Sequence, residues 1–164
     1  MEVKPPKTYT DNDLEEYKLL FNPRKTEDLI SFGVPKEIVD DCILRCIEKI
    51  KEYQDYRPFD VTALIKEGFL NIKPGTPITC NIEYKKSVTY VRIGQINENK
   101  IEGVGRLFYM TNCNGNPPID WVMDHISEGQ FDGSISGFGR YFEHSKYFNA
   151  GWYNKGIFNG YVID

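Results

Sequence analysis

The glycines in the second half of the chain, from Gly94 to Asp164, recur at regular spacings. They fall into three groups, with later glycines 9 and 11, then 4, 8 and 10, then 5 and 9 residues after the first. The residues are Gly94, Gly103, Gly105, Gly129, Gly133, Gly137, Gly139, Gly151, Gly156 and Gly160. Because glycine tolerates positive φ and close backbone approach, this recurrence predicts a repeated structural unit. The glycine spacing predicts the architecture of this half of the chain and does not indicate a catalytic activity.

The connections inside the three groups indicate hairpin turns. The middle group has Asp132-Gly133, which is typical of a two-residue turn with positive φ at both residues. The outer groups have Asn-Glu-Asn at 97–99 and Asn-Lys-Gly at 154–156, which suit a type I turn closed by a left-handed residue. The shorter turn accounts for the residue that the middle group lacks. Each unit is therefore predicted to be a strand, a tight turn and a returning strand.

From Gly94 to Asp164 the chain resembles the MORN (membrane occupation and recognition nexus) repeat, whose pattern is roughly Tyr-x-Gly-x-Trp-x-x-Gly-x-x-x-Gly-x-Gly. The glycines match. The Trp position is held by Ile96, Phe131 and Tyr153, and the leading Tyr position by Arg92, Ser127 and Asn149. The resemblance implies a ladder of stacked hairpins that serves as an interaction or scaffolding element in cytoskeletal, ciliary or membrane-associated assemblies.

Length and charge narrow the class of protein. A chain of 164 residues with 40% hydrophobic content can build a core without disulfides. A net charge of −4 and the lack of a basic stripe argue against nucleic acid and against strong adhesion to an anionic membrane. No apolar run approaches the ~20 residues of a transmembrane helix, and the start has no hydrophobic signal region. We expect an intracellular protein, cytoplasmic or cytoskeletal, with a mitochondrial location peripheral to a membrane complex as the alternative.

The first half of the chain has helical signals. Predicted helices cover 11–21, 26–32, 36–54 and 60–67; the capping residues Asp11, Thr26 and Asp60 begin three of them, and Pro35 opens the other. The strongest, 36–54, carries an apolar stripe of period 3.6 that should cover another surface. We therefore expect an α+β fold in which 1–76 is a helical N-terminal region and 77–164 is a MORN-like elongated antiparallel sheet of stacked hairpins, with a loop inserted at 111–125.

Within that sheet, alternation assigns side chains to two faces. The predicted strands are 78–84, 88–97, 101–110, 127–131, 136–143, 147–153 and 157–163. One face should carry Gly103, Gly105, Leu107, Tyr109, Gly137, Gly139 and Tyr141, and the other Val104, Arg106, Phe108, Met110, Phe138, Arg140, Phe142 and His144. We expect aromatic rings of adjacent strands to lie flat over the glycines, either as the module's own core or as a groove for a partner or a lipid head group.

Signals for metal binding or catalysis are weak. Cys42 and Cys46 lie one helical turn apart, but Cys80 and Cys113 are isolated, so buried thiols fit better than a zinc site. The two histidines, His125 and His144, occupy different repeat positions and suit a surface or a turn. The run 133–137 lacks the central serine of a nucleophile elbow. We predict a non-enzyme with no cofactor and no metal.

Two features suggest that the chain binds protein partners. Trp121, Val122 and Met123 form an apolar cluster on what should be a projecting loop, where Trp121 could be an anchor or could fold back as a lid. The last predicted strand could be an edge that accepts a partner strand through Ile157, Phe158, Tyr161 and Ile163. The favoured function is a non-catalytic scaffold or accessory subunit of a larger complex.

Two alternatives remain open. The chain could be a peripheral phosphoinositide or membrane binder that uses Lys85, Lys86 and Arg92, together with Arg106, Arg140 and Lys146 if all converge on one surface. It could instead be a regulatory annex of an enzyme carried on another chain.

Overall fold

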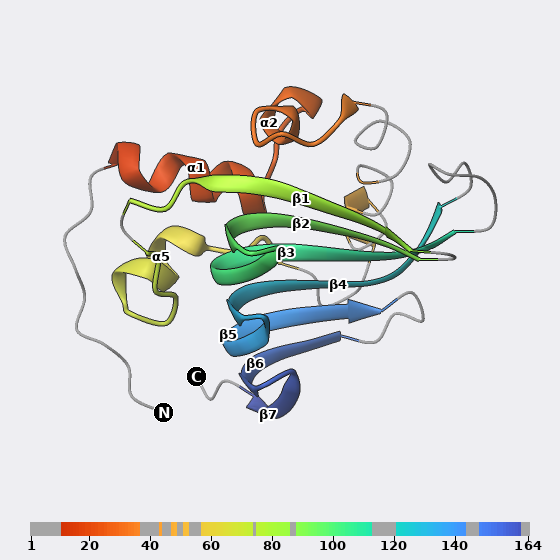
Figure 1. The fold of residues 1–164 in the computed structure, drawn as a ribbon. Coiled ribbons are helices and arrows are strands. Elements are labelled where there is room, and N and C mark those ends of the chain that lie inside the picture. The colour runs from red at the N-terminus through yellow and green to blue at the C-terminus, as the bar shows by residue number, and fades with distance from the viewer. Residues whose placement is uncertain are drawn as a thin grey trace.

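The computed structural model describes residues 11–36, 43, 47–48, 51–52, 57–73, 75–85, 88–112, 121–143 and 148–161. These residues form a mainly β, roughly α+β fold in which a seven-stranded antiparallel sheet is accompanied by short helices (Figure 1). The elements are α1 (Asp11–Phe21), α2 (Thr26–Ile30), α5 (Val61–Lys66), β1 (Ile78–Lys85), β2 (Val88–Asn97), β3 (Lys100–Asn112), β4 (Trp121–Asp132), β5 (Ser134–Glu143), β6 (Phe148–Asn154) and β7 (Ile157–Tyr161).

The strands lie in the sheet in the same order as in the sequence, β1 to β7. Each strand from β2 to β7 is antiparallel to, and hydrogen-bonded with, the strand that precedes it in the chain. Short connections between consecutive strands allow only this arrangement of neighbours. The predicted succession of antiparallel hairpins is confirmed, and the two edges of the described sheet are β1 and β7.

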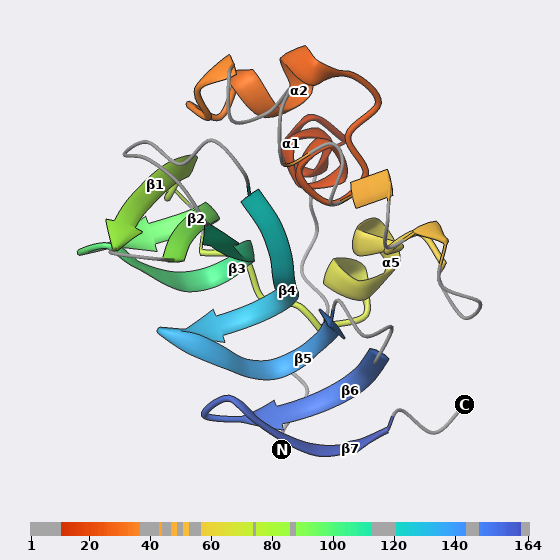
Figure 2. The ribbon, with the colours of Figure 1, turned by 90° about the vertical axis from the view of Figure 1, so that its right-hand side faces the viewer.

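The helices cover one face of the curved sheet. Figure 2 shows α1 and α5 on the same side of it. On this covered face Val91, Val104, Phe108 and Phe142 are buried and share one core with helical residues such as Leu20. The face predicted to carry Val104 and Phe108 is thus the one that packs against the helices. The face that carries Tyr109 and Tyr141 is called the open face below.

The described helices begin and end close to their predicted positions, with one difference in capping. Helix α1 has the predicted bounds, and Asp60 caps α5 by accepting a hydrogen bond from the Ala63 backbone N–H (3.3 Å). At α2 the side chain of Asp28, and not that of Thr26, accepts from the backbone N–H groups that precede the helix. Most of the predicted helix 36–54 lies outside the described residues. Its residues Ile43 and Ile47 are buried in the core.

The repeat glycines form a row across the sheet. The register pairs Gly94 with Gly105, Gly105 with Gly129, Gly129 with Gly139, and Gly139 with Gly151. Backbones approach so closely along this row that a Cβ atom at Gly129 would lie 2.5 Å from the carbonyl oxygen of Phe138. The sequence spacing of the glycines therefore places one in each strand from β2 to β6 at the same level.

At the glycine row the strands bend, and the hairpin ends fold over the open face. A Cβ atom at Gly105 would lie 2.8 Å from Cγ2 of Ile101, and one at Gly139 would lie 2.5 Å from Cδ1 of Ile135. In a straight strand, residues four apart are separated by about 13 Å. The expectation that aromatic rings lie over these glycines is wrong, because the bend brings isoleucines of the same strand onto them.

The turns differ from those predicted. Asp132 and Ser134 pair directly, and only Gly133 between them has positive φ (+79°), so this is not a two-residue turn with two left-handed residues. In the outer hairpins two consecutive residues have positive φ, Glu98 with Asn99 and Lys155 with Gly156. The outer loops therefore have two residues rather than three. The loop of the middle hairpin is shorter because β4 and β5 remain paired as far as Asp132 and Ser134, which leaves Gly133 as the only loop residue.

The predicted loop 111–125 is shorter than expected, because strands occupy both of its ends. Strand β3 continues to Asn112 and β4 begins at Trp121, and these two residues pair. Residues 113–120 lie outside the described part of the chain. Residues 121–123 pair with residues 110–112 of β3, so they belong to a paired strand and not to a projecting loop.

Candidate functional site

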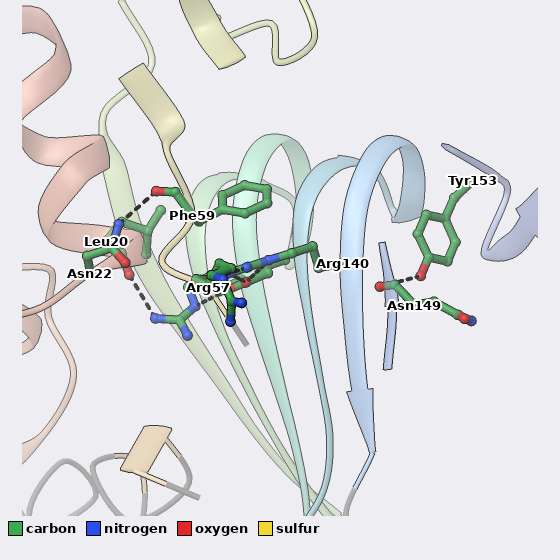
Figure 3. A network of polar contacts seen from close by, with 9 residues as sticks. Leu20, Asn22, Arg57, Phe59, Arg140, Asn149 and Tyr153 are labelled. Atoms are coloured by element: carbon green, nitrogen blue, oxygen red, sulfur yellow. Dashed lines mark hydrogen bonds and ion pairs between the residues drawn. The ribbon is translucent and has the colours of Figure 1, made fainter. Parts of the chain in front are cut away.

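A buried group of charged residues joins the covered face to the helices (Figure 3). Glu128 on β4 lies between Arg106 on β3 and Arg140 on β5 in the strand register. Nε of Arg106 lies 2.9 Å from one carboxylate oxygen of Glu128, and Nε of Arg140 lies 2.7 Å from the other. All three residues are buried. The cluster is enclosed by the fold and is not an accessible ligand site.

Both arginines also bind backbone carbonyl groups of the first half of the chain. Nη1 of Arg106 donates to the carbonyl of Leu20 (3.0 Å), in the last turn of α1, where a helix dipole favours a cation. Nη1 of Arg140 donates to the carbonyl of Arg57 (2.5 Å). The cluster therefore fixes the helical segments on the sheet. Arg106 and Arg140 do not belong to any exposed basic surface.

The covered face also holds the segment that leads into β1. Gln95 and Gln130 stand at the same repeat position, directly after the first glycine of their units. Gln130 accepts from the Asn71 backbone N–H (2.8 Å) and donates to the Asn71 carbonyl (3.1 Å). Gln95 accepts from the Lys73 N–H (3.0 Å) and donates to the Lys73 carbonyl (2.8 Å). The two side chains thus act as a substitute for a neighbouring strand.

The third unit completes this arrangement with an aromatic contact. Trp152 occupies the position of the two glutamines, and its ring centroid lies 5.6 Å from that of Phe69. Residues 69, 71 and 73 therefore meet the third, second and first units in turn. Gly103 provides the necessary room, because a Cβ atom there would lie 2.4 Å from Oε1 of Gln95. The prediction that Gly103 shares a face with Tyr109 is therefore wrong, because its positive φ of 134° turns this position toward the covered face. Sequence reasoning missed these glutamines, although their equal repeat positions were a visible signal.

The open face carries a row of four ring side chains, which we call the ring ladder: Tyr90, Tyr109, His125 and Tyr141, one from each of the strands β2 to β5. Successive ring centroids are 4.9, 4.7 and 5.0 Å apart. Each of the four side chains is partly exposed. The predicted face of Tyr109 and Tyr141 is confirmed, and His125 joins it within a strand rather than a turn.

The two ends of the ring ladder differ in charge. Beside Tyr90, Nζ of Lys85 and the guanidinium carbon of Arg92 lie 5.2 and 5.0 Å from the ring centroid. Both cations share Glu83, at 3.9 and 3.2 Å, which leaves one positive charge in excess in this group. At the far end, the Tyr141 hydroxyl donates to a carboxylate oxygen of Glu143 (2.7 Å). The open face is thus more positive beside β1 and β2 and more negative beside β5.

A cavity of about 400 Å³ continues from the ladder beneath the folded hairpin ends. Its lining residues are Leu107, His125, Ser127, Phe131, Gly133, Ser134, Ile135, Tyr141, Asn149, Tyr153, Gly156 and Phe158. His125 and Tyr141 belong to both the ladder and the cavity. A mainly apolar lining with a few polar groups is typical of a binding pocket. The sequence did not indicate this cavity, because it exists only where the strands bend.

A second hollow, of about 660 Å³, lies between α1 and the residues before α5. Its charged lining residues have both signs, among them Glu15, Lys18 and Arg24. Arg24 and Glu15 already pair at 3.3 Å, and both side chains are well exposed. This hollow offers no net charge and is less suited to a defined ligand than the cavity on the open face.

The described residues contain no cluster of three or more metal-binding side chains. Cys80 is half-buried, and burial raises the pKa of its thiol to about 12, so the thiol stays protonated at neutral pH. Cys42, Cys46, Cys113 and His144 lie outside the described residues.

The predicted partner-binding residues fall in two places. Trp121, Val122 and Met123 lie in β4, where only their backbone is described. Strand β7 is an edge of the described sheet, as predicted, and Ile157 is 73% exposed on it. Phe158 packs against Tyr153, with ring centroids 5.2 Å apart, and the side chain of Tyr161 is not described. Ile163, Lys86 and Lys146 lie outside the described residues.

None of the helices in the described part of the chain combines the length and the apolar character needed to cross a membrane. A scan against models of known protein families, a search of curated proteins and a search of solved structures each found no match.

Proposed function

We propose that this protein is a non-catalytic scaffold or accessory subunit that binds a segment of a protein partner on the open face of its sheet, within a larger assembly. One observation carries the proposal. The partly exposed ring ladder continues into the cavity through His125 and Tyr141, whereas the covered face is filled by the chain's own helices and by residues 69–73. Contiguous exposed apolar surface is a feature of interaction sites.

The proposal includes the nature of the repeat. We take the three hairpins to be degenerate MORN repeats, and the equal placement of their glycines in one row supports this view. The setting that fits such a module is a cytoskeletal, ciliary or membrane-associated complex, in the cytoplasm or, alternatively, peripheral to a mitochondrial membrane complex.

Strand β7 offers a second contact in the same proposal. It lies at the edge of the described sheet, and Ile157 on it is largely exposed. A partner strand that pairs with β7 would extend the sheet beside the cavity, because Phe158 lines that cavity.

The membrane alternative has less support. Among the described basic residues that it requires, Arg106 and Arg140 are buried and bind Glu128, so only Lys85 and Arg92 remain, and these share Glu83 and carry a single excess positive charge. A vesicle flotation assay with anionic lipid would favour this alternative if binding were lost on reversing the charges of Lys85 and Lys86. The enzyme-annex alternative requires co-purification with a catalytic subunit whose rate depends on this chain.

The test compares two tyrosines on opposite faces. The tagged chain is purified from its own cells, its partner is identified, and the pair is reconstituted from pure components. Tyr109→Ala should weaken the affinity at least tenfold, because Tyr109 is central in the ring ladder. Tyr84→Ala is the matched control, since Tyr84 is 43% exposed and its position in β1 places it on the other face. Equal affinity of both variants for the partner would refute the open face as the site.

A further inference from the structure

We propose that the partner segment is an extended peptide with a tyrosine or tryptophan side chain that fills the cavity and a carboxylate about four residues away that meets Lys85 and Arg92. This inference rests on the proposed function and specifies the chemistry of the partner at the open face.

The cavity selects a ring with a polar atom. Phe131, Tyr153 and Phe158 supply apolar and aromatic walls, and Ser127 and Asn149 are polar lining residues that are each only 5% exposed. A purely apolar side chain would form no hydrogen bond with the Ser127 hydroxyl, so a side chain that also carries a polar atom gains affinity there. A phenol or an indole fills the apolar space and can also donate a hydrogen bond.

The shape of the surface favours an elongated ligand over a compact one. His125 and Tyr141 line the cavity and also form half of the ring ladder. A ligand whose ring lies in the cavity therefore continues onto Tyr109 and Tyr90, across the strands. An extended peptide has the width and reach for such a path, and its backbone can lie over the ring faces.

Charge sets the direction of the segment. Lys85 and Arg92 together exceed the charge of Glu83 by one, and Lys85 remains well exposed. The opposite end of the ladder carries Glu143, which accepts from Tyr141. A carboxylate of the partner is therefore favoured beside β1 and β2 and disfavoured beside β5.

The distance between the two contacts sets the spacing. The cavity's lining residues extend from β3 to β7, with β5 in the middle, and Tyr90 lies on β2. Three strand separations of about 4.8 Å, or about 14 Å in all, therefore lie between Tyr90 and the middle of the cavity. An extended peptide advances about 3.3 Å per residue. The aromatic residue and the acidic residue should therefore stand about four positions apart.

A random dodecapeptide library displayed on phage tests this directly against the full chain. Enriched peptides should contain a tyrosine or tryptophan with an aspartate or glutamate three to five positions away. A synthetic peptide from that set should bind Lys85→Glu about tenfold more weakly, and replacing the peptide's acidic residue by lysine should restore binding to that variant. Lys66→Glu, the same charge change on exposed α5, should leave the affinity unchanged.

A second variant, Ser127→Ala, tests the contact that the peptide's aromatic residue makes in the cavity. Ser127→Ala removes one polar group without adding volume, and it should reduce the preference for a peptide tyrosine over phenylalanine while leaving the phenylalanine peptide's affinity unchanged. Thermal unfolding of each variant confirms that it is folded.

Three results would overturn the inference: no enriched peptide, enriched peptides without the aromatic and acidic pair, or binding that is unaffected by both Lys85→Glu and Ser127→Ala. A native partner that depends on Tyr109 yet lacks the pair would overturn this inference and leave the proposed function intact. A partner that is indifferent to Tyr109 would overturn the proposed function itself.

Discussion

The side-chain amide of Gln130 forms two hydrogen bonds with the backbone of a single residue, Asn71, which is 59 positions earlier in the chain. Gln95 does the same with Lys73. The covered face of the sheet therefore holds residues 69–73 in the manner of an added strand, through side chains at one repeat position. The helices and residues 69–73 therefore do not cover the open face.

Replacing Gln130 should destabilise the protein. Gln130→Ala leaves the N–H and carbonyl of Asn71 without their partners, which costs about 1–3 kcal/mol in the free energy of unfolding. Urea denaturation measures this quantity. Asn97→Ala is the control, because Asn97 donates to Glu102 in an exposed pair, and its effect should stay within about 0.5 kcal/mol. Equal effects of the two variants would contradict the role assigned to Gln130.

A methyl group in the glycine row should be costly for steric reasons alone. Gly105→Ala places Cβ 2.8 Å from Ile101 and 2.9 Å from the Ile93 carbonyl oxygen, and overpacking of this kind costs about 1–3 kcal/mol. Gly156→Asn is the matched control. Gly156 has φ +87° in a turn, and the equivalent residue of the first hairpin is Asn99, with φ +66°. Thermal unfolding should show a lower midpoint for Gly105→Ala and a nearly unchanged one for Gly156→Asn.

Removal of the charge on Glu128 should destabilise the fold strongly. Glu128→Gln leaves Arg106 and Arg140 buried without their counter-ion, and breaking a buried pair in this way costs about 3–5 kcal/mol. The control is Glu15→Gln, which removes the carboxylate from the exposed pair with Arg24, a type of pair worth about 0–1 kcal/mol. Chemical denaturation of both variants at neutral pH compares them. A mild effect at Glu128 would show that the arginines are satisfied by the carbonyl groups alone.

Cys80 should weaken the fold at high pH. Its thiol has a pKa raised by burial to about 12 in the folded chain, against a value of 9.0 without burial. The unfolded chain therefore loses this proton first, so stability is full below about pH 9 and falls as the pH rises toward 12. Cys80→Ala should show a smaller decline over that range in denaturation experiments. Rapid alkylation of native Cys80 by iodoacetamide at pH 8 would contradict the raised pKa.

The periodicities of the sequence were sufficient for the order of the strands and for most of their bounds, but not for the first part of β4, which was predicted to be a loop. The bounds of β2 and α1 agree with the predicted ranges, and short connections between alternating segments left only an antiparallel succession of hairpins. Alternation also identified Tyr109 and Tyr141 as sharing one face, because side chains in a strand follow a period of two. Strand β7 is an edge of the described sheet because each strand there pairs only with its neighbours in the chain.

The tertiary structure determined which face of the sheet is covered, where the strands bend, and that the glycines allow close approach of neighbouring backbones. Alternation assigns Val104 and Leu107 to opposite faces, but only the position of the helices determines which of the two is buried. The contact of Gln130 with Asn71 and the cluster around Glu128 join residues far apart in the sequence, so no local sequence pattern predicts them. The cavity arises from the close approach of Ile101 and Ile135 to glycines four residues later, which depends on how neighbouring backbones pack. Sequence periodicity reports the local repeat of the backbone, whereas burial and bending are set by contacts between distant segments.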